Sequence, residues 1–168
     1  VYHDSWLTPE AKSNITFHRN AEVVVPKELD LDALRFIWCR SAAELQTLEH
    51  FVSARAWTKY KKFAHEGKRA NLHYCKWTYV ESATLEQKRM VFGFNASTLT
   101  AGPFAARLDV ENQRDGAHYT WENSQFQATQ PLTIGIPQID RPSAYEVRLK
   151  LDGALAFAGR FTPKTAPF

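Results

Sequence analysis

The sequence predicts a mainly β protein, an antiparallel β-sandwich of Greek-key or jelly-roll-like type with one inserted amphipathic helix at about residues 42–66. About eight strand-like segments follow one another at a spacing of roughly 8–12 residues, which is typical of all-β sandwiches. Aromatic residues make up 13% of the chain and Met90 is the only methionine. That composition favours a packed sheet over a bundle of helices.

The first half of the chain supplies strands and then the helix. Residues 14–25 predict one or two strands, and residues 31–40 alternate as another. Ser41 and Glu44 form a capping box that starts the helix, and Gly67 is placed to end it. The helix is predicted to run between them because apolar residues recur on one face, at Leu45, Leu48, Val52, Ala56 and Phe63.

The second half of the chain predicts only strands. Asp152-Gly153 is the strongest hairpin signal, because these residue types accept the positive φ angles of a type I′ turn. Tyr145 stands at the start of a strand and resembles the tyrosine corner of Greek-key sandwiches. The expected strands cover residues 72–80, 88–96, 104–111, 117–122, 132–136, 145–151 and 155–161.

Length and composition indicate one globular domain over residues 1–168. A chain of this size buries a core without metal or a dense set of disulfides. We expect residues 1–13 to form a loosely ordered N-terminal arm and residues 162–168 an extended tail. No apolar run approaches the roughly 20 residues that cross a bilayer, so no transmembrane segment is expected. A start at Val1 is compatible with a removed signal peptide and equally with a trimmed chain.

Charge is segregated along the chain. The segment from Ser53 to Arg89 holds nine Lys or Arg and three Asp or Glu, the first 52 residues hold five cations and eight acids, and the last 79 hold seven of each. An acidic front, a basic middle and a neutral tail predict a surface for an anionic partner, or copies that dock front to middle.

The basic middle supplies the candidate binding residues. Arg55, Lys59 and Lys62 are spaced to share one side of the predicted helix. Attraction to the helix dipole and repulsion between like charges nearly cancel there, so helix stability does not explain the pattern. A solvated helix face is the alternative explanation. The complete candidate site is Arg55, Trp57, Lys59, Lys62, Lys68, Arg69 and Trp77.

Several partners fit this composition. We expect a non-enzymatic domain for recognition or assembly that binds an anionic protein, an acidic glycan or a neighbouring copy of the chain. The alternatives are a protein that binds single-stranded nucleic acid, as a capsid requires, and a hydrolase with an unfamiliar site. The six histidines are scattered, and the sequence lacks metal-ligand spacings, phosphate loops and nucleophile elbows. We therefore expect no catalytic residue, metal or cofactor.

Cys39 and Cys75 are the only cysteines, and each lies within a strand-like run. They are a candidate disulfide, which would stabilise the fold by about 3–4 kcal/mol in the chain-entropy model. Burial as two small hydrophobic residues is the alternative. A disulfide would agree with a secreted or periplasmic protein, which is the localisation that we expect.

Overall fold

The computed structural model describes residues 34–67, 77–95, 101–136 and 143–163. The chain divides into a unit of residues 1–34 and a unit of residues 35–168, and almost all described residues belong to the second unit. The strand expected at residues 14–25, the arm at 1–13 and most of the tail lie outside the described residues. The single domain over residues 1–168 stays a prediction.

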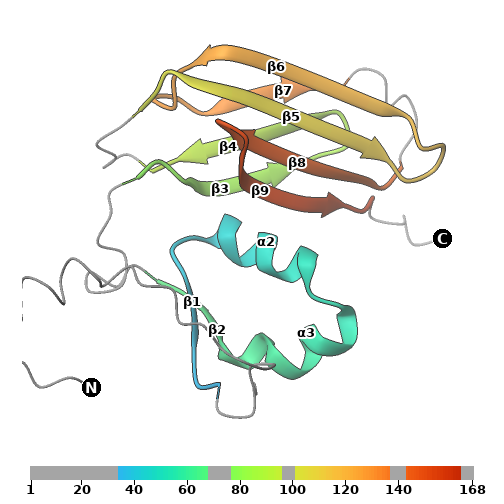
Figure 1. Ribbon diagram of the computed structural model, residues 1–168. Coiled ribbons are helices and arrows are strands. Elements are labelled where there is room, and N and C mark those ends of the chain that lie inside the picture. Colours follow the sequence, from blue (N-terminus) through green and yellow to red (C-terminus); the bar gives the residue numbers. More distant parts are fainter. Residues whose placement is uncertain (1–33, 68–76, 96–100, 137–142, 164–168) are drawn as a thin grey trace, which may run out of the picture. The chain divides into compact units, whose positions relative to one another are not determined.

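The second unit contains two antiparallel sheets packed as a sandwich (Figure 1). One sheet has the order β3-β4-β7 and the other has the order β6-β5-β8-β9. This is the strand order of an immunoglobulin-like sandwich in which the fourth strand of the sandwich, β6, pairs with the second sheet instead of the first. The predicted fold class is therefore confirmed. The strands are β3 (Val80–Leu85), β4 (Arg89–Phe94), β5 (Phe104–Asn112), β6 (His118–Phe126), β7 (Leu132–Gly135), β8 (Tyr145–Leu151) and β9 (Ala154–Phe161).

The core lies between the inner faces of the two sheets. Strand β5 shows the expected alternation, because Ala106, Leu108 and Val110 are buried while the residues between them face outward. Phe92 of β4 meets Phe157 of β9 edge to face, with ring centroids 5.5 Å apart. Both rings are fully buried, so this contact joins the two sheets directly.

The hairpin between β8 and β9 is confirmed at its predicted turn. Asp152 has a φ of 50° and Gly153 a φ of 79°, as a type I′ turn requires. The Asp152 carboxylate also accepts a hydrogen bond of 2.8 Å from the Ala105 N–H. The turn residues therefore hold the start of β5 as well as the hairpin.

Tyr145 connects the two sheets at the start of β8. Its ring is fully buried, and its hydroxyl donates a 2.5 Å hydrogen bond to the Glu86 carbonyl in the turn between β3 and β4. A tyrosine corner bonds to backbone a few residues upstream, whereas this bond crosses to the other sheet. Burial, and then the charge of Glu86, raise the pKa of the phenol.

The prediction of one helix over residues 42–66 is wrong in its extent. Two helices are present, α2 (Ala42–Phe51) and α3 (Ala54–Tyr60), followed by the 3₁₀ turn η4 (Lys61–Phe63). The chain turns because Val52 is extended and Ser53 caps a new helix, its hydroxyl accepting from the Ala56 N–H at 3.3 Å.

The chain after η4 is a strand instead of the last helical turn. Strand β2 (Ala64–Glu66) pairs in parallel with β1 (Ile37–Cys39). Gly67 therefore ends no helix, and its N–H donates to the Cys39 carbonyl at 3.0 Å. Helical periodicity in the sequence carried no information about this competing strand partner.

Helix α2 closes one open side of the sandwich, where β3 and β9 are the edge strands of their sheets (Figure 1). At its first turn the Ser41 hydroxyl accepts from the Glu44 N–H at 3.2 Å and donates to the Val80 carbonyl of β3 at 2.7 Å. Six residues later, the Thr47 hydroxyl accepts from the Ala158 N–H of β9 at 3.1 Å. Two hydroxyls thus satisfy backbone groups on both edges.

We predict that Ser41→Ala lowers the free energy of unfolding by about 2–3 kcal/mol in urea denaturation. The change removes a helix cap, at about 1 kcal/mol, and leaves the buried Val80 carbonyl without a donor, at about 1–2 kcal/mol. Ser53→Ala is the control, because it removes only an exposed cap and should cost about 0.5–1 kcal/mol. Equal losses in the two variants would contradict the bridging role of Ser41.

Candidate functional site

The predicted cations of the basic segment gather on α3 and η4. Arg55 and Lys59 lie on α3, Lys61 and Lys62 lie on η4, and all four side chains are exposed. We call these four residues the cationic face. Lys68 and Arg69, which the sequence analysis added to the site, lie outside the described residues.

Three residues of the cationic face, Arg55, Lys61 and Lys62, form no ion pair with a described residue. The ion pairs formed within the described part of the chain involve Arg40, Arg89, Arg107 and Arg160. Among the described residues, no carboxylate lies within ion-pair distance of Arg55, Lys61 or Lys62. Within the described part of the chain, these three side chains are exposed to solvent.

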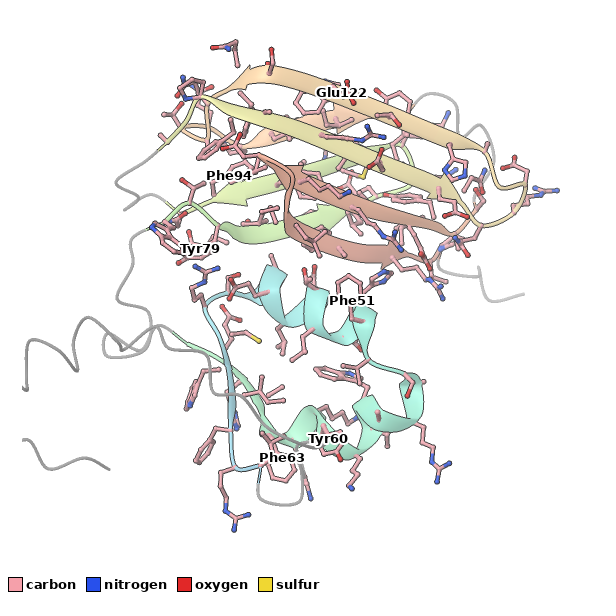
Figure 2. The ribbon with its side chains drawn as sticks, viewed as in Figure 1. Phe51, Tyr60, Phe63, Tyr79, Phe94 and Glu122 are labelled. Atoms are coloured by element: carbon pink, nitrogen blue, oxygen red, sulfur yellow. The ribbon has the colours of Figure 1, made fainter. Side chains whose placement is uncertain are left out.

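Aromatic rings beside the cationic face are covered by its lysines. The Lys59 ammonium lies 5.0 Å from the centre of the Tyr60 ring, and the Lys62 ammonium lies 4.9 Å from the centre of the Phe63 ring. Figure 2 labels both rings, which come from α3 and η4. Such contacts hold the ammonium groups in place, and they leave those ring faces unavailable for stacking on a base.

Arg55 stands where a cation is unfavourable for the helix. Helix α3 begins at Ala54, and its first turn contains no acidic residue. The positive end of the helix dipole repels a cation there, at a cost of about 0.3–1 kcal/mol. Of these two side chains, Lys59 in the last turn is stabilised by the helix dipole, whereas Arg55 is not. The sequence alone predicted this stabilisation for the whole basic segment.

A groove lies between the two helices and the edge strands of the sandwich. It has a volume of about 1230 Å³ and is lined by α2, α3, β3, the outer face of β8 and the end of β9. We call it the edge groove. Its aromatic groups are Phe51, Trp57 and Phe161, and the Phe51 side chain, at the end of α2 (Figure 2), is 58% exposed.

Charged groups on β8 and β9 form the floor of the edge groove. The Arg160 guanidinium donates to the Glu146 carboxylate. This hydrogen bond, together with the charges of Arg160, His50 and Arg148, lowers the pKa of Glu146 against the opposing effect of burial. One carboxylate thus faces three basic side chains.

Trp57 and Trp77 lie in different hollows. Trp57 is half-buried in the edge groove, whereas Trp77 is 67% exposed and lines a second pocket of about 380 Å³ beside β8 and β9. In that pocket the Arg40 guanidinium lies 4.5 Å from the centre of the Tyr79 ring. The two tryptophans therefore do not share one hollow, and their common binding role stays a prediction.

The expected disulfide is absent at Cys39. Cys39 is a free thiol, buried at the end of β1, and Cys75 lies outside the described residues. The alternative of a small buried hydrophobic residue is correct for Cys39. Burial, and then the negative charge of Glu44, raise the pKa of the thiol, which makes it a poor nucleophile.

The described part of the chain has no candidate metal site and no candidate membrane-spanning helix. No group of three or more His, Cys, Asp and Glu side chains there could hold a metal ion. No described helix is both long enough and apolar enough to cross a bilayer.

The edge groove was not predicted from the sequence. Phe51 belonged to the predicted single helix, and Arg148 and Arg160 were the polar positions of two alternating strands. The sequence did contain one signal for a break in the helix. Ser53 is a second possible helix cap, twelve residues after the first cap at Ser41. A chain reversal there leaves α2 against β9 and places α3 across the groove from it.

We predict that Cys39 reacts slowly with a thiol reagent such as 5,5′-dithiobis(2-nitrobenzoate) at pH 8. The raised pKa lowers the thiolate fraction, and burial limits access. Reaction in urea should be faster by about two orders of magnitude or more. Cys75→Ser should be used so that one thiol is followed, and rapid reaction of this variant in the native state would contradict the placement of Cys39.

We predict that Arg160→Gln raises the pKa of Glu146, followed by NMR titration of its carboxyl carbon. In the wild type the folded pKa lies below the unfolded value of about 4.3. Glu146 therefore stabilises the fold above that pH, and this stabilisation is lost as the pH falls through the folded pKa. Arg160→Gln should lose less stability than the wild type over this acidic window. An unchanged carboxyl titration would refute the pairing.

Comparisons with known proteins assign no family. No protein-family model matches the chain, and no curated protein matches it. Among solved structures, a DUF3244 family protein from Bacteroides vulgatus, described as having an immunoglobulin-like β-sandwich fold, is similar at 12% identity and a TM-score of 0.35, over 49% of this chain and 82% of that one. The fold assignment given above rests on the strand order and the core of this chain.

Proposed function

We propose that this chain is a non-enzymatic recognition domain that binds an anionic partner through the cationic face. The observation that carries the proposal is that Arg55, Lys61 and Lys62 are exposed and that no described carboxylate pairs with them. Side chains of one charge gathered on one surface attract an oppositely charged surface and accelerate its association.

The fold itself gains little from this arrangement. Arg55 lies in the first turn of α3, where the helix dipole opposes it. Arg55 and Lys59 are also four residues apart in one helix, which costs about 0.2–0.5 kcal/mol through repulsion. Since Arg55 does not stabilise the helix, a partner explains its position better than the fold does.

The chemistry favours an anionic protein or acidic glycan over single-stranded nucleic acid. A sequence-independent site for single strands combines cations with open aromatic faces on which bases stack. The nearest rings, Tyr60 and Phe63, are each covered by a lysine ammonium, and Trp57 is half-buried in the edge groove. Assembly with neighbouring copies through their acidic segments is a further form of the same proposal.

Localisation stays a prediction. A secreted or periplasmic site was expected, with which a disulfide would have agreed, and the free thiol of Cys39 does not add that support.

We predict that Arg55→Glu with Lys62→Glu weakens binding to heparin and to poly-glutamate about tenfold, measured by isothermal titration at low salt. Each exposed ion pair contributes about 0.2–1 kcal/mol, and reversal adds repulsion. The slope of affinity against salt concentration should also fall. The free energy of unfolding should not decrease, because Arg55→Glu places an acid at the positive end of α3.

The matched control is Arg114→Glu with Lys150→Glu, which changes the formal charge equally on other parts of the sandwich. This control should bind almost as the wild type does. If both double variants lose affinity equally, binding depends only on net charge and the cationic face has no special role.

A further inference from the structure

The outer edge of β9 is only partly covered. The Ala158 N–H points away from β8, because the Thr47 hydroxyl of α2 accepts from it at 3.1 Å. Backbone groups alternate between the two sides of a strand, and β9 pairs regularly with β8 between Phe157 and Phe161. The backbone groups of Arg160 therefore point to the same outer side as those of Ala158, and Thr162 follows directly after the end of β9.

Helix α2 does not reach these residues. It ends at Phe51, and among the described residues no helix, turn or side chain hydrogen-bonds to the backbone of Arg160 or Thr162. Within the described part of the chain, the edge of β9 is thus covered at Ala158 and uncovered two residues later. Unpaired backbone on an edge strand is a template for another strand.

The edge groove runs along this open edge. Four consecutive residues, 159–162, line it. The side chains of a strand alternate between two faces, so side chains alone would contribute every second residue. A run of four indicates that the backbone edge itself is part of the groove wall, and the opposite wall comes from α3 and from β3.

We propose that an extended acidic peptide segment of a partner protein adds as a strand to β9 at Arg160 and Thr162, inside the edge groove. This inference rests on the proposed function, because it names the partner's chemistry and the way it binds. Main-chain hydrogen bonds would give the affinity, and the groove walls would select alternate side chains.

Charge complementarity selects an acidic segment. Two of the three carboxylates in the groove are already paired, Glu86 with Arg89 and Glu146 with Arg160, which leaves Glu49. The groove also contains two basic side chains, Arg148 and His50. Arg148 has no ion pair with a described residue. Arg55 and Lys59 each directly follow a groove residue of α3, Ala54 and Thr58. They therefore add two positive charges at the rim of the groove.

An aromatic anchor is present for the apolar side of the segment. The Phe51 ring is exposed within the groove, although a large apolar side chain usually gains free energy from burial. Trp57 and Phe161 lie in the same groove. An added strand with alternating acidic and apolar residues would place carboxylates over the guanidinium groups of the outer sheet face and apolar groups against these rings.

The first experiment uses the blocked peptide Glu-Val-Glu-Phe-Glu-Val-Glu and fluorescence anisotropy. Two versions carry N-methyl groups, one on the two inner glutamates and the other on the two valines. These amides point to opposite edges of an extended strand. We expect one version to bind at least tenfold more weakly than the parent peptide and the other to bind within about twofold of it. Equal affinities for the two versions would overturn the proposal, as would no binding of the parent peptide at millimolar concentration.

The second experiment compares Arg160→Pro with Arg160→Gln. Both remove the charge, but only proline removes the outward N–H, and an edge strand tolerates proline where that N–H faces solvent. We expect Arg160→Pro to bind the parent peptide about fivefold or more weakly than Arg160→Gln does. Equal binding by two folded variants would contradict strand addition. If Arg160→Pro fails to fold, the methylated peptides decide the question with the wild type.

The two proposals can fail separately. If heparin binding depends on Arg55 and Lys62 while the two methylated peptides bind alike, the cationic face stands and strand addition is wrong. If the protein instead forms a concentration-dependent dimer that Arg160→Pro abolishes, the occupant is a second copy of the chain and the acidic peptide is wrong. Loss of both heparin dependence and peptide selectivity removes both proposals.

Discussion

The structure depends on how the sandwich closes its open side. Strands β3 and β9 are neighbouring edge strands of the two sheets. If nothing covered them, two rows of backbone groups would be exposed. Helix α2 covers both edges with two hydroxyl groups. The Ser41 hydroxyl donates to the Val80 carbonyl, and the Thr47 hydroxyl accepts from the Ala158 N–H. Each hydroxyl also bonds within its own helix, so the helix cap and the sheet edges stabilise each other.

The proposed recognition surface follows from the limited length of that helix. Because α2 ends at Phe51 and the chain turns at Ser53, the edge of β9 beyond Ala158 stays open and α3 becomes the wall of a groove. The same turn places Arg55 at the start of a helix, where its charge opposes the dipole. The proposed recognition surface therefore comes from the residues at which the helix breaks.

Local patterns predicted the sandwich, and tertiary competition decided the rest. Alternation in β5, the Asp152-Gly153 turn and the Ser41 cap each depend on neighbouring residues, and the sequence was sufficient for them. The end of the helix depended on β1, a strand 25 residues upstream of β2 with which residues 64–66 pair. Hydrophobic periodicity does not detect a partner that is distant in the sequence. For the same reason, it did not predict that Trp57 and Trp77 lie in different pockets. The open edge of β9 could be seen only once the covering helix had been placed.

Amide hydrogen exchange of the protein alone tests most directly whether α2 divides the β9 edge into a covered and an open part. The Ala158 amide should exchange slowly in the wild type and at least tenfold faster in Thr47→Val, which keeps the shape of the side chain and removes its hydroxyl. The Arg160 amide should exchange fast in both proteins. Strong protection of Arg160 in the wild type, or an Ala158 amide indifferent to Thr47→Val, would contradict the account.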